Sequence, residues 1–338
     1  MQHIKLFKSI RIFVFSFVLC LFALSAQSAD RAYILATATT GGTYYPVGVA
    51  LSTLTKVKLE PKQKLSLSAI SSAGSGENVK LLREGEAQFA ILQGLYGLWA
   101  AKGTGQLTNS GKQEYLRSVT MLWQNVEQFV VKSNLVKSGT MSDMAQLKGR
   151  KFSIGKRNSG TEGSGRQILG NLGFDPDKDF NLVYQGYGPS AESMQNGNIV
   201  GMNIPAGVPT SAITSAYANL GDSITILGFS QREINKINKD APLWTRFVIP
   251  ANTYPGQIKA VETVAQPNFL AVHESVPDQD VYLIVKTIYE NLPFLVGIHK
   301  ATKAMALEKA IAGLPNQLHP GALKFYREQG LDIPAYLQ

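Results

Sequence analysis

The sequence contains a single cysteine, Cys20, and few histidines. Cys20 lies in an N-terminal segment that we expect to be removed, so the remaining chain forms no disulfide and no thiolate site. After this segment the histidines are His273, His299 and His319, which are far apart and lack the spacing of a metal site. We therefore expect neither a metal nor any other cofactor.

Long apolar runs are absent after residue 29, which predicts a chain without a later membrane span. At the N-terminus, Lys5, Lys8 and Arg11 precede an apolar run over 12–24, and small residues follow at 25–29. This order is typical of a secretory signal peptide, and the run is shorter than the roughly 20 residues of a membrane anchor. The sequence predicts a signal peptide over 1–29 and export to the periplasm. Lipidation of Cys20 is not expected, because no small residue precedes it.

Runs of one charge and nucleotide-binding motifs are also missing. Residues 1–29 hold three of the 33 basic residues and none of the 24 acidic ones, so the net charge falls from +9 to +6 on cleavage. The lysines are dispersed, which argues against nucleic-acid binding. No P-loop, dinucleotide fingerprint or Gly-x-Ser-x-Gly elbow occurs. We expect a protein that is not an enzyme.

Short apolar runs alternate with longer amphipathic stretches along the rest of the chain. This alternation predicts an α/β fold with largely parallel sheets. Predicted strands include 33–38, 65–69, 88–92, 119–123 and 129–132, and predicted helices include 44–56, 161–172, 209–218 and 301–311.

No linker rich in Pro, Gly or Ser separates two domains, as expected where two lobes are joined by strands that cross between them. Extended stretches near 126–132 and 261–272 are the candidate crossings. We therefore predict one lobe over 30–125 plus 265–338 and a second lobe over 126–264.

Three loops rich in glycine and hydroxyl groups each follow a predicted strand and begin a predicted helix. They are 39–46, 71–78 and 158–162. In the second loop Ser75 is the predicted N-cap, and in the third Ser159 and Glu162 have the spacing of a capping box. Helix starts carry unpaired N–H groups and a partial positive charge of about +0.5, which suits a carboxylate or phosphate. Together with the nearby Lys156 and Arg157, the loops predict a small anionic ligand.

The order of several motifs resembles the TAXI family, the substrate-binding proteins of one class of TRAP transporters. The matching segments are Thr40-Gly41-Gly42-Thr43-Tyr44-Tyr45-Pro46-Val47-Gly48, Ser75-Gly76-Glu77-Asn78, Asn158-Ser159-Gly160-Thr161-Glu162, Ala206-Gly207-Val208-Pro209 and His319-Pro320-Gly321-Ala322. The resemblance covers nearly all of the chain after residue 29. Carried over by motif, it implies ligand contacts from Gly42, Thr43, Tyr44, Ser75, Asn78, Gln93, Ser159, Gly160, Thr161 and Pro209.

The resemblance implies a type II periplasmic binding-protein fold, with the ligand held between two lobes. It also implies delivery of a dicarboxylate, 2-oxo acid or amino acid such as glutamate to TRAP membrane subunits. We expect the protein to be a monomer. Two alternatives stay open: a ligand sensor that docks on a signalling receptor, and a periplasmic enzyme acting on small carboxylates. Gly163 and Gly165, and Gly94 after Gln93, depart from the family pattern and leave the ligand's identity open.

Overall fold

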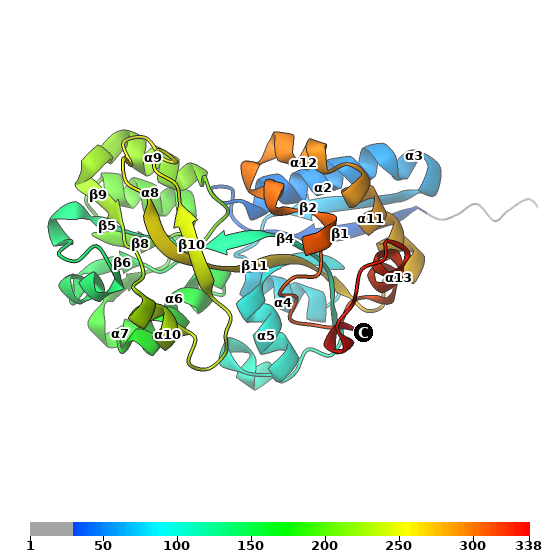
Figure 1. Ribbon diagram of the computed structural model, residues 1–338, viewed down its shortest axis with the longest axis horizontal. Helices are drawn as coiled ribbons and strands as arrows, with labels where there is room; N and C mark the ends of the chain where they lie inside the picture. The colour runs from blue at the N-terminus through cyan, green and yellow to red at the C-terminus, as the bar shows by residue number, and fades with distance from the viewer. Residues whose placement is uncertain (1–29) are drawn as a thin grey trace, which may run out of the picture.

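The computed structural model describes residues 30–338 and consists of two α/β lobes side by side (Figure 1). The predicted signal peptide, 1–29, lies outside the described residues. Each lobe is built around its own sheet and covered by helices, which agrees with the predicted α/β binding-protein architecture.

The first sheet has the strand order β10-β11-β3-β1-β2, with β4 also paired to β11. Its strands are β1 (Arg31–Ala36), β2 (Leu65–Ile70), β3 (Phe89–Gln93), β4 (Leu116–Val126), β10 (Thr245–Ile249) and β11 (Val261–His273). Helices on this side are α2 (Tyr44–Lys58), α3 (Glu60–Gln63), α4 (Ser75–Arg83), α5 (Gly94–Lys102), α11 (Asp278–Glu290), α12 (Leu292–Ile298) and α13 (Pro320–Glu328). Strands β2 and β3 both pair parallel to β1, so their carboxyl ends point the same way.

The second sheet has the order β7-β6-β8-β5-β9. Its strands are β5 (Phe129–Lys132), β6 (Lys151–Ser153), β7 (Asn181–Val183), β8 (Gly201–Asn203) and β9 (Ile224–Ile226). The accompanying helices are α6 (Gly160–Leu172), α7 (Pro176–Asp179), α8 (Tyr187–Gln195), α9 (Ser211–Leu220) and α10 (Gln231–Ile237).

Two segments connect the lobes (Figure 1). Strand β4 passes through Glu127 and Gln128 into β5, and β11 runs antiparallel to β4 from Leu116 opposite His273 to Val126 opposite Ala265. We propose that the first lobe comprises 30–125 plus 265–338 and the second lobe 126–264. Strand β10, placed by that division in the second lobe, hydrogen-bonds to β11 of the first sheet, while its Ile249 packs in a hydrophobic cluster with Met202 of β8 and Ile226 of β9.

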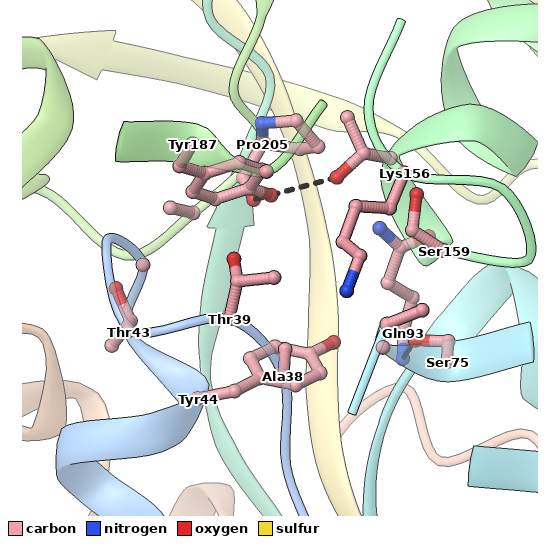
Figure 2. Close-up of a pocket in the computed structure, with 17 residues that line it drawn as sticks. Ala38, Thr39, Thr43, Tyr44, Ser75, Gln93, Lys156, Ser159, Tyr187 and Pro205 are labelled. Atoms are coloured by element: carbon pink, nitrogen blue, oxygen red, sulfur yellow. Dashed lines mark hydrogen bonds between the residues drawn. The ribbon is translucent and has the colours of Figure 1, made fainter. Parts of the chain in front are cut away.

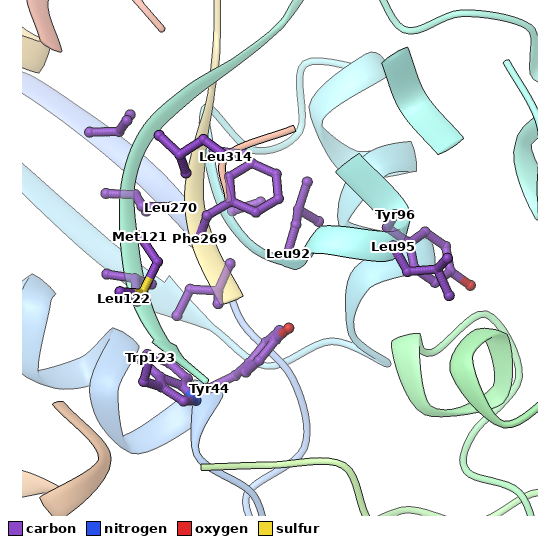
Figure 3. Packing of buried hydrophobic residues seen from close by; sticks show 14 of the residues in the cluster. Tyr44, Leu92, Leu95, Tyr96, Met121, Leu122, Trp123, Phe269, Leu270 and Leu314 are labelled. Atoms are coloured by element: carbon purple, nitrogen blue, oxygen red, sulfur yellow. The ribbon is translucent and has the colours of Figure 1, made fainter. Parts of the chain in front are cut away.

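The core near the connection is aromatic and fixes the start of α2. Trp123 of β4 is fully buried, and its ring meets that of Tyr44 edge-on with centroids 5.8 Å apart (Figure 3). Burial of such rings is a major source of packing energy. The contact therefore anchors the first residue of α2 against the sheet.

The predicted helix over 301–311 is wrong. This segment forms two short 3-10 turns, Lys300–Ala304 and Leu307–Lys309. The carbonyl of Ala310 accepts hydrogen bonds from the Met121 N–H (2.7 Å) and the Thr120 hydroxyl (3.3 Å), so the segment lies along β4. These tertiary hydrogen bonds override the favourable helix propensity of the sequence.

No single helix within residues 30–338 is long and apolar enough to cross a membrane. The pair α11 and α12, bent by 70° at their junction, passes that test jointly, by length and composition alone.

Candidate functional site

A cavity lies between the lobes (Figure 2). Eight of the ten residues predicted for the ligand site line it: Gly42, Thr43, Tyr44, Ser75, Gln93, Ser159, Gly160 and Thr161. Other lining residues include Thr39, Gly74, Lys156, Gly186, Tyr187 and Pro205. The three predicted loops therefore meet at one place, although they are far apart in the sequence.

Four helices of the described chain begin at this cavity. The residues that precede α2, α4, α6 and α8 are Thr43, Gly74, Ser159 and Gly186, and all four line it. The first amides of these helices, those of Tyr44, Ser75, Gly160 and Tyr187, make no hydrogen bond within residues 30–338. Free amides and aligned helix dipoles give the cavity a positive potential.

The caps of these helices differ. The Ser159 hydroxyl accepts from the Glu162 N–H at 3.0 Å, which confirms Ser159 as the N-cap. The other half of the predicted capping box differs, because the Glu162 carboxylate accepts from the N–H of Asn158 at 2.8 Å and not from that of Ser159. The prediction for Ser75 is wrong, because Gly74 is the cap, with a φ of +121° that favours glycine. The Ser75 hydroxyl instead accepts from the Gln93 N–H at 3.1 Å and ties the end of β3 to α4.

Lys156 is the one charged side chain among the residues that line this cavity in the described chain. Figure 2 shows its amine directed into the cavity, across from Thr39. The neighbouring Arg157 lies instead over the Tyr184 ring, 3.7 Å from its centroid. The lining thus combines helix starts and a cation with no acidic side chain, which favours an anion.

Two tyrosines form the walls. The Tyr44 hydroxyl donates to Asn268 Oδ1 at 2.6 Å, and the Tyr187 hydroxyl donates to the Pro205 carbonyl at 2.6 Å and pairs with Thr161 Oγ1 at 2.8 Å (Figure 2). Burial raises the pKa of both phenols well above the usual value, so both stay neutral.

Tyr187 lines the cavity but was not among the site residues predicted from the sequence. The sequence does contain an indication of this residue: Gly186 comes shortly after a strand and directly before the first residue of a helix. That pattern is the one which identified the other three loops.

Asn78 and Pro209 do not line the cavity. Asn78 is fully buried, and its amide donates to the carbonyls of Thr37 (2.8 Å) and Ile91 (2.9 Å), which joins α4 to β1 and β3. These hydrogen bonds hold the start of α4 in place beside the cavity, so Asn78 positions the site without contacting the cavity. Pro209, which follows a cis peptide bond, lines a separate open groove with Pro46 and His299.

Glycines bring the lobes into direct contact. A Cβ built at Gly42 would stand 3.0 Å from the Tyr187 ring, one at Gly160 2.7 Å from the Gln93 side chain, and one at Gly163 2.6 Å from the Tyr96 ring. We call Gly42, Gly160 and Gly163 the glycine seam. The unexpected glycine at 163 therefore has a packing reason: a larger residue there would hold the lobes apart.

Hydrogen bonds cross the same interface. The Glu77 N–H donates to the Asn158 carbonyl at 2.9 Å, and the Tyr96 hydroxyl donates to the Ser159 carbonyl at 3.1 Å. Thr43 Oγ1 donates to the Gly207 carbonyl at 3.2 Å. The structure is therefore that of a closed cleft. Among residues 30–338, no cluster of His, Cys, Asp or Glu is placed to hold a metal ion.

Solved structures share this architecture at low sequence identity. MatC from Rhodopseudomonas palustris, solved with bound malate, is 13% identical with a TM-score of 0.53, covering 89% of this chain and 97% of its own. The periplasmic binding protein BugD is 11% identical with a TM-score of 0.52, covering 89% and 94%. A ligand-binding component of an ABC-type import system from Staphylococcus aureus, solved with zinc, is 10% identical with a TM-score of 0.50, covering 90% and 94%. These likenesses establish the fold of periplasmic binding proteins.

A family model matches most of the sequence. It is that of the NMT1-like family, and the match runs over residues 35–330, which includes the whole cavity. The chain therefore belongs to the NMT1-like family.

Proposed function

We propose that this protein is a periplasmic solute-binding receptor that captures a small anionic solute by closure of its two lobes. One observation carries the proposal: four helix N-termini and a single cation, Lys156, surround one interlobe cavity whose lining holds no acidic side chain in the described chain. Unpaired amides at helix starts and a cation bind carboxylates and phosphates well. Among the described lining residues, the hydroxyls of Thr43, Ser75, Ser159 and Thr161 pair with backbone groups or with Tyr187 and not with a carboxylate or imidazole base, which favours binding over catalysis.

We further propose that the receptor delivers its solute to the membrane subunits of a TRAP-type transporter. The support is the order of the loop motifs, from Thr40-Gly41-Gly42-Thr43 to His319-Pro320-Gly321-Ala322, which resembles the TAXI receptors. Solute uptake into vesicles that carry the membrane proteins encoded beside this gene tests the delivery step. A neighbouring histidine-kinase gene, together with no uptake, would favour the sensor instead.

The anion proposal is tested by a thermal-unfolding screen of the protein after signal removal, against dicarboxylates, 2-oxo acids, amino acids and neutral sugars. A true ligand at 100 times its Kd stabilises the folded state by about 2.7 kcal/mol. Stabilisation by sugars alone would exclude an anionic ligand.

The role of Lys156 gives a sharper test. We expect Lys156→Met to weaken binding of the best anion about tenfold or more, because a charge-assisted hydrogen bond is lost. Lys102→Met removes an exposed lysine at the end of α5, away from the cavity, and serves as the matched control. Equal affinities for both variants in calorimetric titration would place the anion elsewhere.

A further inference from the structure

Exposed apolar side chains gather on two neighbouring helices of the first lobe. Seven large apolar side chains are exposed among residues 30–338, and four of them belong to α2 and α12: Val49, Val57, Phe294 and Ile298. Each of the four is between 39% and 63% exposed. Single exposed apolar residues are ordinary on protein surfaces, whereas a group of them on adjoining elements indicates an interaction surface.

The two helices are in contact and lie together along the upper edge of the first lobe in Figure 1. Pro46 of α2 and Ile298 of α12 line the same open groove. The exposed residues Val49, Thr53 and Val57 follow along α2 at spacings of three and four residues, so they share one face of this helix with Pro46. The exposed face of α2 is therefore continuous with α12.

Helix α12 carries no polar side chain. All seven residues of Leu292–Ile298 are apolar or glycine, and Leu295 is the one that is buried. Pro293, Phe294, Gly297 and Ile298 are exposed. A helix at the surface of a globular protein normally turns polar side chains outward, so the outer face of α12 fits a partner that offers apolar contact and few hydrogen bonds.

Lysines occur throughout the same part of the fold. Segments 44–63 and 292–304 form α2, α3, α12 and the turn that follows α12, and they contain five lysines against one acidic residue, Glu60, which gives a net charge of +4. The lysines, all of them exposed, are Lys56, Lys58, Lys62, Lys300 and Lys303. Since the chain after residue 29 has a net charge of +6, these two segments hold most of its positive excess. The charge of this surface is complementary to an anionic partner.

We propose that the four exposed apolar residues of α2 and α12, together with these five lysines, form a docking surface for a membrane that carries anionic lipid headgroups. We call this surface the α2–α12 face. Apolar side chains enter the boundary between headgroups and acyl chains, while the lysines bind the lipid phosphates. All of these residues belong to the first lobe, so docking does not require the cavity to hold a solute. The inference and the proposed capture of an anion therefore stand or fall separately.

Co-sedimentation with lipid vesicles tests this surface. The protein after signal removal is mixed with vesicles of phosphatidylcholine alone, or of phosphatidylcholine with phosphatidylglycerol. We expect clearly tighter binding to the vesicles that contain phosphatidylglycerol, because their surface is anionic. The preference should shrink in about 1 M salt, where charges are screened within about 3 Å. Equal binding to both kinds of vesicle, or binding to neither, would overturn the inference.

Substitutions separate the apolar part of the α2–α12 face from its charged part. Phe294→Ser should weaken vesicle binding about tenfold, because less apolar surface enters the membrane. The double variant Lys300→Gln with Lys303→Gln should weaken it about twentyfold, since each lysine near an anionic surface contributes a factor of about five. All three side chains are exposed, so the variants should unfold at nearly the same temperature as the wild type.

Matched controls come from the second lobe. Ile258→Ser removes the most exposed of the seven apolar side chains (76%), and Lys236→Gln with Lys239→Gln neutralises two exposed lysines at the end of α10. Vesicle binding should stay unchanged in both controls, and losses as large as those from the α2–α12 face would overturn the inference. Binding only to vesicles that also contain the membrane proteins encoded beside this gene would overturn it too, because the face would then dock on protein and not on lipid.

Discussion

Two serines cap helices in the same way, but only one of them borders the cavity. Comparing them distinguishes the effect of a cap on stability from its effect on binding. Ser159 caps α6 at the cavity, and Ser230 caps α10 away from it, in a complete capping box with Glu233. Both hydroxyls accept an N–H three residues on. Only the first also borders the space where an anion would be held.

We expect Ser159→Ala and Ser230→Ala each to lower the free energy of unfolding by about 1 kcal/mol, because each helix loses a cap. Ser159→Ala should in addition weaken solute binding, whereas Ser230→Ala should not. Chemical denaturation and calorimetric titration of both variants measure the two effects. Equal affinities would show that the Ser159 hydroxyl serves the helix alone.

Individual elements show how far local sequence patterns predict this structure. The prediction of a strand over 129–132 is confirmed as β5, and the Ser159 cap is confirmed at α6. Both depend on neighbours in the sequence: an apolar run and a hydroxyl three residues before Glu162. The predicted helix over 301–311 failed because its partner is β4, almost 200 residues away. Asn78 has its amide on β1 and β3, which no local pattern reveals. The helices α10 and α13 were not predicted.

The attachment of α11 to β1 is another long-range feature. Asp280 of α11 is fully buried, accepts from the Tyr33 hydroxyl at 2.7 Å and pairs with Arg31. We expect Asp280→Ala to lower the free energy of unfolding by about 2 kcal/mol, below the usual cost of breaking a fully buried pair because Arg31 is partly exposed. Denaturant titration measures the change. Lys286→Ala removes an exposed pair with Glu290 in the same helix and should leave stability almost unchanged; similar losses in both would contradict this account.

At the scale of the whole molecule, an alanine in the glycine seam should stabilise its helix and, at the same time, oppose closure of the two lobes. Gly163→Ala improves the intrinsic helix propensity of α6 by about 1 kcal/mol but places a methyl group against Tyr96 in the closed form. We expect solute affinity to fall while lobe stability is kept. Gly170→Ala lies in the same helix and meets nothing within 4 Å, so it should stabilise without loss of affinity. Matching affinities for the two variants, measured by calorimetry, would contradict a role for the seam in closure.

The Glu77 N–H, whose acceptor is the Asn158 carbonyl of the opposite lobe, has a consequence for the study of this protein in solution. Each time the lobes part, that amide loses its acceptor and becomes available to deuterium from the solvent. The backbone N–H of Asn78, one residue later, donates to the Gly74 carbonyl within its own lobe and keeps this acceptor when the lobes part. The ratio of the two hydrogen-exchange rates therefore reports how often the lobes separate, and it can be measured on the unmodified protein.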